Sequence, residues 1–90
     1  MTINRIRLRV DDYFSTSDLA LASAIALHFP LEAIDKTQNQ YRAQFLFKRD
    51  LGLDELVESY WRGELQVEPQ TYFNQLKSIK ARLYSDGGSK

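Results

Sequence analysis

The chain of 90 residues is long enough for one domain with a modest core, and 43% of its residues are hydrophobic. It contains no cysteine, which excludes disulfides and thiolate metal sites, and its formal net charge of zero argues against a dedicated duplex-binding domain, which is usually strongly basic. The sequence has no apolar block suited to a signal peptide or a membrane span, so we expect a cytoplasmic protein without membrane contact.

Residues 3–10 alternate between apolar and basic side chains. This period of two predicts a strand with one buried face. The apolar positions are Ile6, Leu8 and Val10, and the row on the other face is Arg5, Arg7 and Arg9.

Residues 16–29 have the composition of a helix that stops before Pro30. Asp18 would lie in the first turn, where the helix dipole favours a negative charge. The candidate N-cap residues are Ser15, Thr16 and Ser17. The helix is apolar almost all round, which is typical of a helix buried all round. We expect so small a domain to leave one apolar row of this helix uncovered, so we predict a partner interface at Ala20, Ala24 and Leu27.

Residues 31–36 and 40–48 form a predicted hairpin around a polar turn. In the second strand, the aromatic side chains of Tyr41, Phe45 and Phe47 share one face, which raises the question of whether bases could stack on them. Single-strand binders need rings and cations on the same face, whereas here Arg42 and Lys48 take the opposite one. We therefore assign the three aromatic residues to the core.

Two helices follow. The first holds apolar residues at helical spacing between Leu53 and Trp61 and ends at Gly63, and the second runs from Pro69 to about Tyr84. We expect Trp61 and residues 72–73 to pack these helices against each other. The predicted fold is thus a single α+β domain over residues 1–84, with a small sheet and the order β-α-β-β-α-α, followed by a flexible tail at residues 85–90.

The residues that most enzymes require are scarce. The one histidine, His28, lies in an apolar helix, and no phosphate-binding or nucleophile motif occurs. Asp11 and Asp12 could bind a metal ion, but the end of a strand explains them better. Glu55 and Glu58 could act as an acid-base pair, but a solvated helix face explains them better. We therefore expect no catalysis, no cofactor and no metal.

Two blocks, YFSTSDLALASAIAL and VESYWRGELQVEPQTYFNQLKSIKARLY, are similar to a family of short bacterial and phage proteins classed as a domain of unknown function. The similar positions are residues 13–22 and 60–84, and the match covers roughly three quarters of the chain. The resemblance implies a fold and a phage or mobile-element setting, and it implies no activity. Each shared element also has a structural explanation, such as a helix cap or a helix end.

Two functional hypotheses follow from the sequence. The first is a non-enzymatic interaction module that uses the apolar row of residues 20, 24 and 27. It would be a homo-oligomer or an accessory subunit of a larger assembly, such as a nucleoprotein one. The second is an accessory protein that contacts nucleic acid non-specifically through a basic sheet face. That face would combine Arg5, Arg7, Arg9, Arg42 and Lys48, although charge on an edge strand also serves solubility alone. Lys77 and Lys80, with Arg82 and Tyr84 nearby, form a second basic candidate, which the solvated side of a helix would equally explain.

Overall fold

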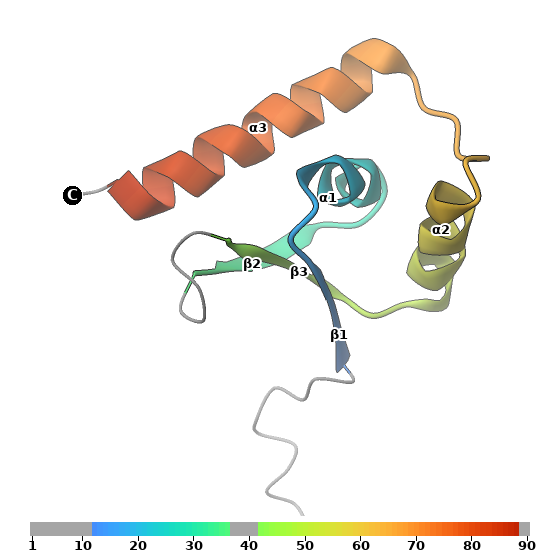
Figure 1. Cartoon of the computed structure of the whole chain (residues 1–90), viewed down its shortest axis with the longest axis horizontal. Helices are drawn as coiled ribbons and strands as arrows, with labels where there is room; N and C mark the ends of the chain where they lie inside the picture. Colours follow the sequence, from blue (N-terminus) through green and yellow to red (C-terminus); the bar gives the residue numbers. More distant parts are fainter. Residues whose placement is uncertain (1–11, 37–41, 89–90) are drawn as a thin grey trace, which may run out of the picture.

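The computed structural model describes residues 12–36 and 42–88, and in this part of the chain the elements follow the order β-α-β-β-α-α. The predicted α+β class with a small sheet is therefore confirmed. The elements are β1 (Tyr13–Thr16), α1 (Leu19–Ala26), β2 (Leu31–Asp35), β3 (Gln44–Lys48), α2 (Leu51–Trp61) and α3 (Pro69–Gly88). In Figure 1, α1 lies at the centre, with α3 running along one side of it and the sheet on the other.

The sheet has the strand order β1-β3-β2, and both pairs are antiparallel. Phe47 of β3 stands opposite Phe14 of β1 on one side and Leu31 of β2 on the other, so an apolar row crosses the three strands. The register between β2 and β3 shifts between Leu31 and Ala33. Because side chains alternate along each strand, this row and the row of Phe45 face the same side of the sheet.

The aromatic residues of β3 belong to the core. Phe45 and Phe47 are 2% and 0% exposed, which confirms their predicted burial. Tyr41 lies outside the described residues. Bases cannot stack on rings that the protein itself covers, so Phe45 and Phe47 do not form a stacking platform.

The first described strand is β1, which precedes α1 directly. The strand predicted over residues 3–10 lies outside the described residues. Thr16 was expected to begin the helix, but instead it ends β1, opposite Phe45. The segment is extended because Phe14 can then pair with Phe47 in the apolar row. The helix starts three residues later than predicted, at Leu19, and its N-cap is Asp18 rather than one of the preceding hydroxyl residues.

The C-terminal helices begin and end at recognisable signals. Gly63 follows the α2 C-cap with φ of 73°, a left-handed conformation that favours glycine. Pro69 begins α3 as predicted, and the Glu68 carboxylate accepts hydrogen bonds from the Thr71 amide and hydroxyl, each at 2.7 Å. The helix continues to Gly88, beyond the predicted end near Tyr84.

Candidate interaction site

The apolar row on α1 is largely covered by the chain itself. Ala24 is only 2% exposed and belongs to the core, while Ala20 and Leu27 are half-buried. The prediction that Ala24 lies open to a partner is therefore wrong. The physical reason is the position of α3, which runs along α1 and donates a hydrogen bond from the Tyr72 hydroxyl to the Ala20 carbonyl oxygen at 3.0 Å (Figure 1).

The burial of α1 is nearly complete around its axis. Five consecutive residues, which point to every side of a helix, are buried: Leu21, Ala22, Ser23, Ala24 and Ile25. The one polar member, Ser23, donates its hydroxyl to the Leu19 carbonyl oxygen at 2.8 Å. A helix that is apolar almost all round is thus largely covered by the two other helices and a small sheet.

A pocket of about 260 Å³ opens where α1, the end of α2, the α2–α3 linker and the start of α3 meet. We call it the tyrosine pocket, and its lining residues are Ala24, Tyr60, Gly63, Leu65, Val67 and Tyr72. The turn at Gly63 lets the linker follow α2 directly, and Pro69 then starts the helix that carries Tyr72. Residues far apart in the sequence are therefore brought together by two well-defined breaks in helical structure.

Asp18 connects this pocket to the first turn of α1. Its Oδ1 accepts hydrogen bonds from the Ala20 amide at 2.9 Å and the Leu21 amide at 3.3 Å, and its Oδ2 accepts one from the Tyr60 hydroxyl at 3.3 Å. The carboxylate thus caps one helix while it orients a side chain from another.

Both pocket tyrosines are held in their neutral form. Burial and then the negative charge of Asp18 raise the pKa of Tyr60 and of Tyr72 above the ordinary value of 10.0. A phenol that acts as a base or a nucleophile near neutral pH would need the opposite shift. The pocket therefore offers apolar walls and fixed hydroxyl groups, and no activated group.

Two apolar side chains are exposed at the tyrosine pocket: Val67, which lines it, and Trp61, which lies next to the lining residue Tyr60. Val67 is 36% exposed, and Trp61, which contacts Tyr60 edge-on with ring centres 5.1 Å apart, is 65% exposed. The expected packing of Trp61 and Phe73 between α2 and α3 is wrong, because α3 packs mainly on α1 and leaves both rings in solvent. Trp61 lies at the edge of the α2 apolar face, beyond Leu53 and Leu56.

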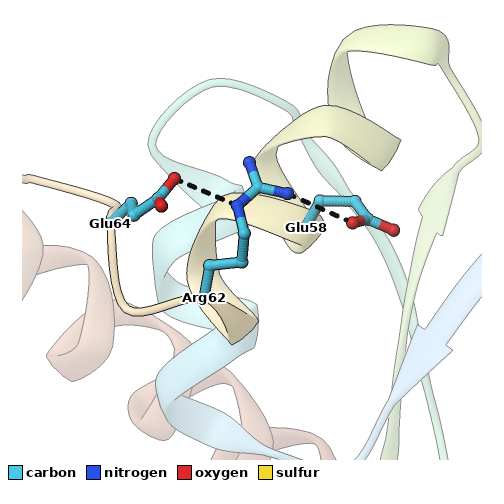
Figure 2. A network of polar contacts seen from close by, with 3 residues as sticks. All are labelled: Glu58, Arg62 and Glu64. Atoms are coloured by element: carbon cyan, nitrogen blue, oxygen red, sulfur yellow. Dashed lines mark hydrogen bonds and ion pairs between the residues drawn. The ribbon is translucent and has the colours of Figure 1, made fainter.

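Charged residues surround the turn beside the pocket. Figure 2 shows the Arg62 guanidinium between Glu58 and Glu64, with Nη1 3.4 Å from Glu58 Oε1 and Nε 3.0 Å from Glu64 Oε1. These pairs are exposed, so each contributes about 1 kcal/mol or less to stability. They do tie the start of the linker to the last turn of α2. They also neutralise the one basic residue in an otherwise acidic segment.

The described residues place only part of the predicted basic sheet face. Arg5, Arg7 and Arg9 lie outside the described residues. Arg42 donates a hydrogen bond to the Ser17 hydroxyl at 2.9 Å, and Lys48 is exposed at the far end of β3. A hollow of about 320 Å³ beside Lys48 and Arg49 is also lined by Glu32 and Asp50, so its charges are mixed. No continuous basic surface forms on the described part of the sheet.

The other candidates from the sequence are dispersed. Lys77 and Lys80 are exposed on α3, and His28 is exposed just after α1. Asp18 is occupied as a helix cap, and Asp11 lies outside the described residues. Within residues 12–36 and 42–88, no group of three or more histidine, aspartate or glutamate side chains could hold a metal ion.

The tyrosine pocket itself was not predicted from the sequence. Tyr60 and Tyr72 were placed only as members of apolar rows. A signal was nevertheless present, because a tyrosine among aliphatic residues needs a hydrogen-bond partner when it is buried. Two such tyrosines indicate two polar contacts, which the structure places at Asp18 for Tyr60 and at the Ala20 carbonyl for Tyr72.

Comparison with known proteins gives a family and no function. No curated protein and no solved structure matches the chain. No helix in the described part of the chain is long and apolar enough to cross a membrane. Residues 11–85 match the family described as a domain of unknown function (DUF5659), a range that contains every residue of the tyrosine pocket and begins after Arg9. Since the match covers most of the sequence, the chain belongs to the DUF5659 family.

Proposed function

We propose that this domain is a small, non-enzymatic interaction module that binds a protein partner in the cytoplasm through the tyrosine pocket and its rim. The observation that supports the proposal is the exposure of Trp61, at 65%, beside a preformed pocket. Tryptophan and tyrosine are over-represented among residues that dominate binding energy, and exposed apolar surface of this kind is typical of interaction sites. The contact surface that we propose therefore lies at the junction of α2 and α3, and not on α1, where the sequence analysis placed it.

The size and chemistry of the pocket favour a side chain over a cofactor. Pockets for small ligands usually enclose about 300–1,000 Å³, whereas this one holds about 260 Å³. Its walls are mainly apolar, and its hydroxyl groups already bond to Asp18 and to the Ala20 carbonyl. An apolar side chain of a partner would fill it without requiring new polar partners.

A second copy of the chain is the first partner to test, because most soluble oligomers are homo-oligomers. Trp61 is the one tryptophan in the sequence, so its fluorescence reports directly on this surface. We expect sedimentation velocity to show concentration-dependent dimers at micromolar protein, with a blue shift of Trp61 emission. Val67→Glu, at the pocket rim, should weaken association at least about tenfold, which corresponds to about 1.4 kcal/mol.

Leu51→Ser provides the matched control. Leu51 is 77% exposed at the opposite end of α2, so the substitution removes exposed apolar surface without changing the pocket. It should leave association unchanged. A protein that stays monomeric with unchanged Trp61 emission at every concentration would refute self-association through this surface, and an equal effect of Leu51→Ser would refute the assigned location.

A further inference from the structure

One side of α3 combines exposed aromatic rings with exposed lysines. Phe73 and Tyr84 are 56% and 66% exposed, and Lys77 and Lys80 between them are also exposed. We call these four residues the α3 stripe. Each residue of the α3 stripe follows one residue of the inward-facing row, which consists of residues 72, 76, 79 and 83. One position on an α-helix corresponds to about 100°, so the α3 stripe is rotated by that angle from the buried side of α3.

The α3 stripe contains two basic residues and no acidic residue. By sequence, α3 carries Lys77, Lys80 and Arg82, and its one acidic residue, Asp86, follows the stripe. Among the described residues, the ion pairs involve Arg49 and Arg62, and neither stripe lysine takes part in one. Lys77 Nζ instead lies 5.3 Å from the centre of the Phe73 ring, so a cation and a ring lie together on this surface. Such a surface attracts an anionic partner that also has flat apolar faces.

We propose that the α3 stripe binds single-stranded nucleic acid, with bases stacked on Phe73 and Tyr84 and phosphates held by Lys77 and Lys80. Rings and cations share one face here, which is the arrangement that β3 lacks. At about 1.5 Å rise per residue, Phe73 and Tyr84 are about 16 Å apart along the helix, which leaves room for a few nucleotides. The fold also buries one side of α3 against α1, so the stripe is held on a fixed support.

The charge of the whole protein favours a single strand over a duplex. Duplex binding depends strongly on many phosphate contacts, and a chain with zero net charge provides few. Stacking of bases on aromatic rings adds binding energy whatever the nucleotide sequence. Bases in a duplex are stacked on each other, so their faces are not accessible to Phe73 and Tyr84. This inference concerns another surface than the tyrosine pocket and does not depend on the proposed function.

Arg82 supplies a matched control. It carries the same charge as the stripe lysines, but it is two positions from Lys80 and lines a hollow with Ala26 and Pro30 on another side of α3. The sequence grouped Arg82 with Lys77 and Lys80, and the structure separates it from them. Arg82→Gln therefore removes one positive charge without altering the α3 stripe.

The test is fluorescence anisotropy with a labelled oligothymidylate of about 15 nucleotides, within the site sizes of known single-strand binders. Two phosphate contacts predict a slope of about −1.4 in log affinity against log salt, or about a sevenfold loss between about 50 and about 200 mM. The double variant Lys77→Gln/Lys80→Gln should lose most of this salt dependence, while Arg82→Gln keeps it. Phe73→Leu/Tyr84→Leu should bind at least about fivefold more weakly with the slope unchanged.

Several results would overturn the proposal. These are no binding at about 50 mM salt, equal losses for Arg82→Gln and for the double lysine variant, or competition by polyglutamate as strong as by the unlabelled oligonucleotide. The last result would indicate an acidic protein partner instead. Loss of binding only when Arg5, Arg7 and Arg9 are changed to serine would assign the contact to the N-terminal row. Circular dichroism confirms that each variant is folded, and Val67→Glu should bind nucleic acid normally, which separates this proposal from the previous one.

Discussion

Replacing Asp18 by alanine tests the contact that joins α1 to α2. The change removes the acceptor for the Ala20 and Leu21 amides, at 2.9 and 3.3 Å, and for the Tyr60 hydroxyl at 3.3 Å. Loss of an N-cap costs about 1 kcal/mol. Loss of the acceptor for the Tyr60 hydroxyl adds about 0.5–1 kcal/mol, at the lower end for a hydrogen bond because the distance is long. We expect the free energy of unfolding to fall by about 2 kcal/mol, which lowers Tm by about 8–16 °C in a domain of this size.

A double-mutant cycle separates the two parts of this loss. Urea unfolding, followed by circular dichroism, should be measured for Asp18→Ala, for Tyr60→Phe and for the double variant. Tyr60→Phe alone should cost about 0.5–1 kcal/mol, and the double variant should cost little more than Asp18→Ala, since the shared contact is lost only once. Asp50→Ala is the control, because Asp50 caps α2 through the Gly52 amide and has no contact with Tyr60.

The cycle has a result that would contradict the reasoning. If the effects of Asp18→Ala and Tyr60→Phe add within about 0.3–0.5 kcal/mol, as those of Asp50→Ala and Tyr60→Phe should, the Tyr60 hydroxyl contributes nothing through Asp18. A pH series gives a second readout. Because burial and the Asp18 charge raise the pKa of Tyr60, its contribution to stability is present below its ordinary value of 10.0 and is lost as pH rises through the folded-state pKa. Asp18→Ala should make that loss smaller.

Two further predictions concern the α2–α3 linker. Gly63→Ala should destabilise the protein by about 1–2 kcal/mol in urea unfolding, because φ of 73° strains an L-residue although no atom lies within 4 Å of the added Cβ; an unchanged midpoint would show that the turn relaxes freely. Hydrogen bonds from the Thr71 hydroxyl and amide lower the pKa of Glu68, so its contribution is present above the ordinary value of 4.5 and is lost as pH falls through the lowered pKa. Glu68→Gln should flatten the acid limb of a Tm-against-pH curve, and an identical limb would exclude this role.

The sequence was a good guide where a local pattern determines the outcome. Period two on β3 correctly predicted that Phe45 and Phe47 are buried, and the glycine and proline signals correctly predicted the turn at Gly63 and the start of α3 at Pro69. Each of these features depends on residues within a few positions of each other, so the physical preference can be read without the fold.

It was a poor guide where the outcome depends on which elements pack together. The composition of α1 indicated burial all round, but it could not show that α3 would cover Ala24. For the same reason, the expected packing of Trp61 between the C-terminal helices was wrong. Tryptophan is often buried, but Trp61 lies largely in solvent. β1 was missed because its four residues form a strand only through pairing with β3.

The burial of α1 limits where this protein can act. The central helix is used almost entirely for the core, and β3 buries its aromatic residues, so neither element offers an extended contact surface. Among the described residues, the large exposed rings lie on the C-terminal part of the chain, where an acidic segment with Trp61 at residues 50–69 is followed by the basic α3. Folding alone does not require a large ring in solvent at Trp61, Phe73 or Tyr84, because a polar residue there would keep the same core. A stability-neutral substitution that abolishes binding is therefore expected at these rings, whereas the same loss at Ala24 would come with a loss of stability.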